Sequence, residues 1–277
     1  MKRVLLPTDF SDNSWKAMCY AAQLYNNTPV MFYILNNYSA PYDPIEAGII
    51  SYFEPLKKSS EEGLKKIEAR FRDLDHHPET EFKTFSTYGP IHATIQSFEK
   101  KEPESYIVVM GTQGASGLGE LLLGTTTVGV VQNVKSPVIT VPASATLEAP
   151  KNILLAIDNK GIGRLGEIRP LLKLAKAHSA KIAVLNVHVP ETELVLDKDS
   201  PEEYVLDHYL ADIEHSYHSV DGEYIEDKIS QFANRMGADI IALVHRDRGF
   251  WRNLFHSSMT NRLAYHSDLP LFILKDK

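Results

Sequence analysis

Short runs of apolar residues alternate along this chain with longer stretches in which apolar residues recur every three or four positions. The short runs have the length and composition of buried strands, and the longer stretches have the spacing of amphipathic helices. Strand and helix signals that alternate in this way are typical of βαβ units around a parallel sheet. The pattern therefore predicts an α/β fold.

The same order of elements occurs twice. Lys2–Asp9 and Lys151–Asp158 both consist of a basic residue, an apolar run and a final aspartate, and they are 149 positions apart. Ser136–Val141 and Leu269–Leu274 are also alike, but their prolines are only 133 positions apart. The second copy therefore lacks about sixteen residues, which we place between its second and third strands.

The repeat predicts two domains. We place the first at residues 1–142 and the second at residues 151–277. Residues 143–150 are mostly small and are bracketed by Pro142 and Pro150, which is typical of a linker.

Within each domain the pattern predicts five strands with helices between them. The expected strands are Arg3–Thr8, Val30–Asn36, Glu81–Thr87, Tyr106–Met110 and Val138–Val141, then Asn152–Ile157, Ile182–Val189, Ile213–His218, Ile240–Val244 and Leu271–Leu274. The expected helices of the first domain begin after the capping residues Ser11–Ser14 and end near Tyr25, and then cover about Glu54–Asp73, Ile91–Lys100 and Thr125–Val134. Right-handed crossovers make such a domain an open doubly wound sheet, with its ligand crevice at the carboxyl ends of the strands.

A glycine-rich segment follows the fourth strand. Residues 111–125 read GTQGASGLGELLLGT. Gly111 and Gly114 can adopt positive φ and let a ligand approach the main chain, and Gly124-Thr125 opens a helix whose N–H groups favour an anion. The segment is neither a Walker A sequence nor the G-x-G-x-x-G dinucleotide fingerprint. It predicts a phosphate cradle, and the alternative is a glycine-rich turn without a ligand.

The spacing G-x2-G-x9-G-T of this segment resembles that of the ATP-binding universal stress proteins. The resemblance covers both copies and implies two tandem open doubly wound parallel five-stranded sheets with strand order 3-2-1-4-5, the adenine nucleotide alpha hydrolase-like fold. In that family the last strands often pair across a two-fold axis. We therefore expect Val138–Val141 to pair with Leu271–Leu274 within the chain, and similar pairing also allows a homodimer.

The resemblance also implies a nucleotide site in the first domain. Its residues would be Pro7, Thr8, Asp9, Leu35, Met110, Gly111, Thr112, Gly114, Gly124, Thr125 and Thr126. Asp9 would accept from the ribose or the adenine amine or hold Mg²⁺, although it could instead cap the following helix. Leu35 and Met110 would be read as core residues without the resemblance, because apolar strand ends normally pack inward.

The expected ligand is ATP with Mg²⁺ or Mn²⁺, since the glycine-rich segment holds no lysine to neutralise the phosphates. We find no base for an attacking water, so we expect no catalytic residues and little or slow hydrolysis. The resemblance implies a cytoplasmic stress-response regulatory module with unidentified protein partners. The alternatives are a slow ATPase or adenylyl-transfer enzyme on the same fold, and an interaction scaffold without a nucleotide.

The second domain departs from the motif. Val244, Asp247 and Ser257 stand where the first domain has its three glycines, so we expect no ATP there in the family's usual manner. A zinc-type site is one hypothesis for this domain, and scattered surface histidines are the other. The candidate ligands are Asp158, His188, His245 and His256.

The net charge and the cysteine count limit which partners and which compartment are expected. The net charge is −7, so neither nucleic acid nor an anionic membrane is an expected partner. Cys19 is the single cysteine and cannot form an internal disulfide, which suits the reducing cytoplasm. The apolar run Val4–Pro7 is too short for a signal peptide.

Overall fold

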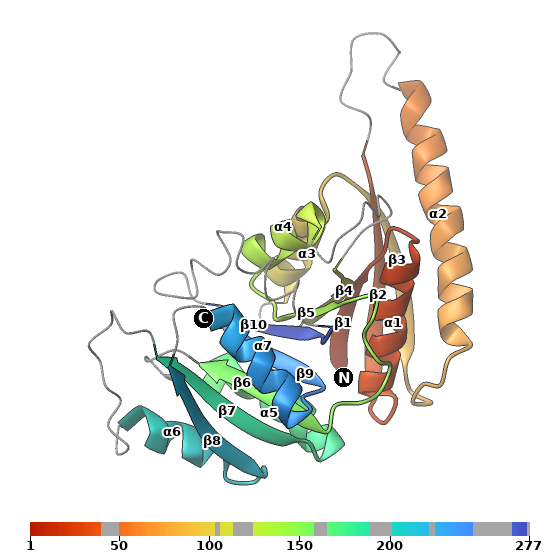
Figure 1. The fold of residues 1–277 in the computed structure, drawn as a ribbon. Coiled ribbons are helices and arrows are strands. Elements are labelled where there is room, and N and C mark those ends of the chain that lie inside the picture. Colours follow the sequence, from red (N-terminus) through yellow and green to blue (C-terminus); the bar gives the residue numbers. More distant parts are fainter. Residues whose placement is uncertain are drawn as a thin grey trace.

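A single ten-stranded sheet forms the centre of the protein (Figure 1). The computed structural model describes residues 1–39, 50–102, 106–112, 124–157, 165–188, 201–221, 225–245 and 268–275. The strand order is β3-β2-β1-β4-β5-β10-β9-β6-β7-β8, so each half of the chain contributes five neighbouring strands in the expected order 3-2-1-4-5.

The first half alternates strands and helices as predicted. Its elements are β1 (Lys2–Pro7), α1 (Asp12–Tyr25), β2 (Val30–Tyr38), α2 (Ile50–Arg72), β3 (Glu81–Tyr88), α3 (Ile91–Lys101), β4 (Tyr106–Gly111), α4 (Thr125–Asn133) and β5 (Val138–Val141). Ser11 is the N-cap of α1, and its Oγ accepts a hydrogen bond from the backbone N–H of Ser14 at 3.2 Å. Asp9 is therefore not the cap of this helix.

The described part of the second half repeats the order up to β9 and ends with β10. Its elements are β6 (Asn152–Ile157), α5 (Leu165–His178), β7 (Lys181–His188), α6 (Pro201–Leu210), β8 (His215–Asp221), α7 (Ile225–Met236), β9 (Ile240–His245) and β10 (Leu271–Lys275). The connection from its second to its third strand spans residues 189–214, against 39–80 in the first half. It is sixteen residues shorter, which confirms where the repeat loses its residues.

The two halves meet edge to edge through an antiparallel pair of strands. Leu271 pairs with Thr140, Phe272 with Ile139 and Ile273 with Val138, whereas the other strand pairs of the sheet are parallel. This confirms the expected pairing of the last strands. Because unpaired edge strands satisfy their peptide groups by joining, the two five-stranded sheets form one continuous sheet.

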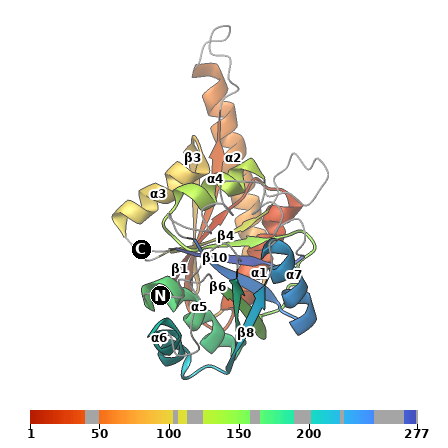
Figure 2. The ribbon, with the colours of Figure 1, turned by 60° about the vertical axis from the view of Figure 1, so that its left-hand side comes forward.

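Helices cover both faces of the sheet (Figure 2). One face packs against α1, α2, α5 and α6, and the other against α3, α4 and α7. Each apolar cluster contains residues of both halves. The hydrophobic core is therefore continuous across the β5–β10 junction.

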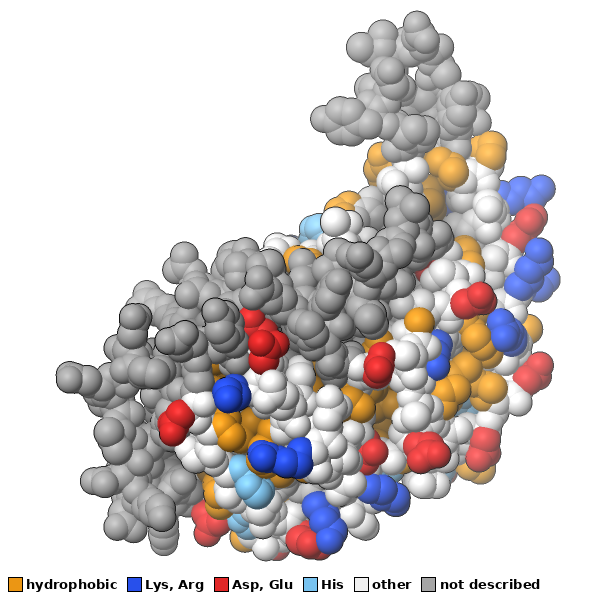
Figure 3. Space-filling model, in the orientation of Figure 1, with side chains coloured by type: hydrophobic (Ala, Val, Ile, Leu, Met, Phe, Trp, Pro, Cys, Tyr) orange, Lys and Arg blue, Asp and Glu red, His pale blue; other side chains and the backbone are white. Residues whose placement is uncertain are grey.

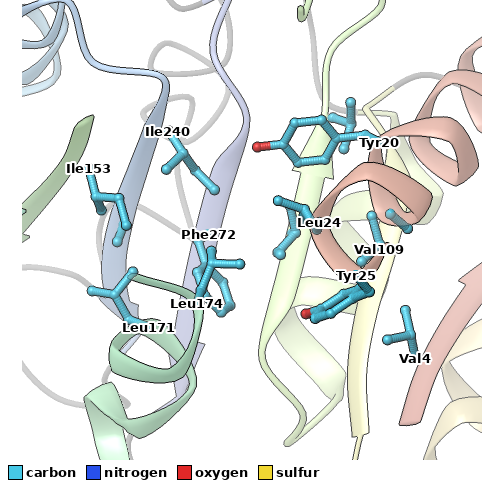
Figure 4. Packing of buried hydrophobic residues seen from close by; sticks show 14 of the residues in the cluster. Val4, Tyr20, Leu24, Tyr25, Val109, Ile153, Leu171, Leu174, Ile240 and Phe272 are labelled. Atoms are coloured by element: carbon cyan, nitrogen blue, oxygen red, sulfur yellow. The ribbon is translucent and has the colours of Figure 1, made fainter. Parts of the chain in front are cut away.

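Helices α1 and α5 face each other at this junction (Figure 4). Tyr20, Leu24 and Tyr25 of α1 lie on one side, and Leu171 and Leu174 of α5 lie on the other, all of them buried. Burial raises the pKa of both tyrosine hydroxyls. The junction is thus a largely apolar seam.

A histidine from α5 adds a polar contact to this seam. His178 is 9% exposed, and its Nε2 donates to the backbone oxygen of Leu24 at 3.0 Å. Burial lowers the pKa of the imidazole below its usual 6.5, and the Lys2 and Lys151 ammonium groups act in the same direction, against the hydrogen bond. The neutral imidazole is therefore the form that the folded protein favours.

The linker between the halves is held against the first half. The Lys16 ammonium donates to the backbone oxygen of Ala143 at 2.6 Å, and Ala145 is 2% exposed. Ser144 donates to Asp268, the residue two positions before Pro270, at 2.7 Å. The linker thus contacts both halves.

The solvent face of α2 carries charged side chains of both signs. Ion pairs four residues apart join Lys57 to Glu61, Lys58 to Glu62 and Arg72 to Glu68. Acidic and basic side chains are likewise interspersed over the described part of the surface in Figure 3. Such pairs each contribute little, about 0.3–0.5 kcal/mol, and they keep this face of the helix in water.

His178 predicts a pH dependence of stability. Because its pKa is lower in the folded than in the unfolded chain, the unfolded chain binds the proton first as the pH falls through about 6.5. The free energy of unfolding should therefore decrease from pH 6.5 down to the folded pKa. Urea denaturation between about pH 7.5 and pH 5.5 measures it.

His178→Gln is the matched variant, because its amide can still donate to Leu24 but does not titrate. The wild-type protein should lose stability relative to this variant as the pH falls. Parallel pH profiles of the two proteins would contradict the assignment.

Candidate functional site

The candidate residues lie where β1, β2 and β4 reach the same edge of the sheet. Pro7 pairs with Leu35, and the β1–β4 register, in which Leu5 pairs with Val108, brings Met110 to the same level. Strand β1 lies between β2, the next strand in the sequence, and β4. This reversal of strand order is the position at which open α/β sheets bind ligands.

Thr8 fastens the end of β1 to its neighbours. Its N–H donates to Leu35 at 2.8 Å, and its backbone oxygen accepts from the Asn36 amide at 2.7 Å. Its hydroxyl lies 3.0 Å from the Ser14 hydroxyl and accepts from the Phe10 N–H at 3.0 Å. Thr8 is only 6% exposed, so its polar groups bond to other residues of the protein.

Asp9 lies on the surface, directly beyond Thr8. One carboxylate oxygen, Oδ1, accepts from the Ser11 N–H at 3.1 Å and from the Ser11 hydroxyl at 2.5 Å. These bonds orient the carboxylate at the carboxyl edge of the sheet, while the residue stays exposed. This placement suits a group that meets a polar ligand from solvent.

Phe10 follows with a left-handed backbone. Its φ is 65°, which is uncommon for a bulky residue and costs about 1–3 kcal/mol. Its ring lies against Gly63 of α2, where an added Cβ would be 2.5 Å from the ring's Cζ atom. The ring is 39% exposed. Because Gly63 has no side chain, the Phe10 ring can pack against α2, and this contact supports the loop that carries Asp9.

Gly111 ends β4 close to the start of α1. An added Cβ would lie 2.7 Å from Asn13 Oδ1 and 3.1 Å from the Asn13 backbone carbon. Gly111 does not have the positive φ that we expected, since among the described glycines only Gly89 and Gly237 do. Its glycine is needed instead for the close approach of Asn13.

Thr112 closes the described part of the glycine-rich segment. Its N–H donates to Val141 at 3.2 Å, and its backbone oxygen accepts from the Gly124 N–H at 2.7 Å. The Asn13 amide lies 3.4 Å from its hydroxyl. The two described ends of the motif, Thr112 and Gly124, are therefore joined at the edge of the sheet.

Helix α4 begins at Gly124 with its first turn at this edge. The N–H groups in the first turn of a helix have no hydrogen-bond partner within the helix itself. Gly124 is the N-cap and has no side chain that could bond them. Thr125 and Thr126 are exposed, whereas Thr127 is buried and donates from its hydroxyl to the Gly111 oxygen at 3.0 Å. Thr127 thus anchors the first turn to the end of β4.

The three apolar candidates are core residues in this structure. Leu35 and Met110 are 0% and 5% exposed, and Pro7 is also buried. Leu35 and Met110 both belong to the apolar cluster under α3 and α4. Packing explains them fully, so the structure alone gives them no ligand role.

Several predicted residues lie outside the described part of the chain. They are Gly114, Asp158, Asp247, His256 and Ser257. His188 and His245 are the last residues of β7 and β9, with β6 between these strands. Within the described ranges no group of three or more His, Cys, Asp or Glu side chains could hold a metal ion. The zinc-type hypothesis stays a prediction.

Reasoning from the sequence missed the polar residues that build the site's frame. Asn36 follows the apolar run of β2 as Asp9 follows that of β1, and this signal could have identified it. The capping pattern predicts only that Asn13 lies at the start of a helix, and no sequence pattern points to Thr127. Their contacts with Thr112 and Gly111 come from the packing of α1 and α4 on β4.

Among the described helices, none combines the length and the apolar character that a bilayer crossing requires.

Comparisons with known proteins agree on one family. A sequence model described as the universal stress protein family matches residues 1–142 and 150–275. A universal stress protein of Methanocaldococcus jannaschii is 29% identical over 143 residues, which covers 50% of this chain and 81% of that protein.

Solved structures show the same fold. A universal stress protein from Archaeoglobus fulgidus superposes with a TM-score of 0.72 at 20% identity and covers 99% of this chain and 96% of its own. A putative universal stress protein from Pseudomonas aeruginosa has a TM-score of 0.61 at 13% identity, with 99% and 93% covered. Both likenesses extend over the two halves together.

Gly111→Ala should destabilise the protein by about 1–3 kcal/mol, because the new methyl group would overlap Asn13, including its backbone. Gly166→Ala is the matched control, since a Cβ on this α5 residue meets nothing within 4 Å. Thermal unfolding of both variants measures the difference. An equal melting temperature for the two would show that the approach of Asn13 to Gly111 is not close.

Proposed function

The chain belongs to the universal stress protein family, and from this membership we propose that its first half is an ATP-binding module that regulates a stress response. The nucleotide would lie at the carboxyl edge of β1 and β4. The adenine would approach Pro7, Leu35 and Met110, and the phosphates would lie along the glycine-rich segment.

The observation that carries this proposal is the joining of the two ends of the G-x2-G-x9-G-T motif. The Gly124 N–H bonds to the Thr112 oxygen at 2.7 Å, so the described residues at the two ends of the motif lie together. They lie beside the reversal of strand order between β1 and β4. The described parts of the motif therefore lie where this fold class binds its ligands.

The start of α4 supports a role in holding phosphate. Its first-turn N–H groups and the positive end of its dipole attract anions, and Gly124 leaves room for a ligand to approach. The exposed hydroxyls of Thr125 and Thr126 can donate as well. These groups are neutral, so they offset little of the triphosphate's charge.

A divalent cation would supply the remaining charge. Mg²⁺ or Mn²⁺ prefers carboxylate and phosphate oxygens, and the exposed Asp9 carboxylate is the anionic group that fits at this edge. Asp9, held in position by Ser11, would be the residue that holds the cation, and the cation would offset the phosphate charge. Gly114 and Thr112 would complete the phosphate-binding segment.

The second half would support the first without binding ATP in the same way. It lacks all three glycines of the motif, and Val244, which replaces Gly111, is a buried core residue at 2% exposure. We place the module in the cytoplasm, where its single Cys19 stays reduced.

Two other functions compete with this one. A slow ATPase or adenylyl-transfer enzyme would release ADP, AMP or pyrophosphate steadily during incubation with ATP, which product analysis detects. A scaffold without a nucleotide would show no bound nucleotide by mass spectrometry of the gently desalted protein and no ATP binding in solution.

Gly124→Val should abolish measurable ATP binding, because its side chain would occupy the space of a phosphate at the start of α4. Isothermal titration of wild-type protein with Mg-ATP should give a submillimolar dissociation constant. A loss of about a hundredfold or more in the variant is expected if phosphate contacts carry most of the affinity.

Ser257→Val is the matched control, since Ser257 is the second half's counterpart of Gly124. It should bind ATP as the wild type does. Undiminished affinity in Gly124→Val, with the protein folded, would refute the proposed site, and a loss in Ser257→Val alone would place the nucleotide in the second half.

A further inference from the structure

A buried lysine from the second half contacts the helix that starts at the candidate site. Lys275 is the last residue of β10 and is 6% exposed. Its ammonium donates a hydrogen bond to the backbone oxygen of Val131 in α4. A lysine is almost never buried without a partner. The burial of Lys275 between the halves therefore calls for a structural reason.

The contact has no counterpart on the other side of the junction. The β5–β10 register is symmetric about Ile139 and Phe272, because Leu271 and Ile273 correspond in the repeat to Val138 and Thr140. By the same offset of 133 positions, Lys275 corresponds to Pro142. Proline has no ammonium group and no N–H, so it cannot make the equivalent bond. The sheet junction is symmetric, but this tie is not.

Three carbonyl groups near the end of α4 are bonded from within the first half. Gln96 of α3 donates to Asn133 at 2.7 Å, and the Asn133 amide donates to Gly129 at 2.8 Å. The Val134 N–H donates to Val130. The Val131 carbonyl is bonded from the second half by the Lys275 ammonium. A positive charge there also complements the negative end of the helix dipole.

Helix α4 is short enough to move as a rigid rod. Its nine residues span about 13 Å, so a shift at Val131 is passed on to the first turn. The first turn is held by Thr127 on Gly111 and by the Gly124 N–H on Thr112. Lys275 and Thr127 therefore hold the two ends of one helix, from different halves of the chain.

We propose that Lys275 is a positioning residue through which the second half sets the placement of α4 and, with it, the phosphate-binding end of the first half's site. The part concerning ATP rests on the proposed function. This role would give the second half a function at the site although it lacks the glycine motif.

Lys275→Met tests the proposal, since methionine keeps a flexible stem but removes the charge and the donor. In the ligand-free protein, amide hydrogen exchange over residues 124–134 should become about tenfold faster. The dissociation constant for Mg-ATP should rise about three- to tenfold, the size expected when a supporting contact outside the site is lost. Lys275→Arg, which keeps the charge and donors, should lie closer to the wild type.

Lys135→Met is the matched control, because Lys135 is an exposed lysine just beyond α4. It should change neither exchange nor affinity. If Lys275→Met does not fold, as circular dichroism would show, Lys275→Gln takes its place with the same expected directions.

Wild-type binding with unchanged exchange and affinity in Lys275→Met would overturn the positioning role and leave the proposed function standing. Faster exchange with unchanged affinity would also overturn it, because α4 would then be loosened without effect on the site. A wild type that does not bind ATP would overturn the proposed function and this inference together, and its own titration identifies that case.

Discussion

The hydrogen-bonded pairing of β5 with β10 is the constraint on which the rest of this structure depends. It converts two five-stranded halves into one sheet and aligns both apolar clusters across the junction. With the strands in register, α1 and α5 come together along a buried seam, and β10 brings Lys275 under α4. The helix that starts at the candidate site in the first half therefore packs partly against the second.

Much of this architecture follows from local pattern. Apolar runs of four to six residues become strands, and the comparison of Lys2–Asp9 with Lys151–Asp158 identifies the repeat and its shortened connection. Strand order and the pairing of the last strands came from the family resemblance. The register of that pairing could not be predicted, because contact between residues more than 130 positions apart leaves no periodic signal.

Part of the candidate site could also be predicted from the sequence, and part could not. Its position at the ends of β1 and β4 and the start of α4 at Gly124 follow from the sequence, since glycine and threonine after an apolar run mark a strand-to-helix turn. The positive φ expected for Gly111 was wrong, and its need for space beside Asn13 is set by another helix and could not be predicted from the sequence. The Phe10 contact with Gly63 and the Lys275 contact with Val131 were beyond reach, since each joins elements distant in the chain.

The anchored linker has a consequence for how such a protein evolves and behaves. Two halves joined by about eight residues meet at an effective concentration in the millimolar range or above, so their association does not vary with the amount of protein in the cell. Two separate identical copies would pair through the same surface, so that surface would have to suit both members of the pair. A fused pair is free of that requirement, and one half can specialise as permanent support while the other keeps the ligand.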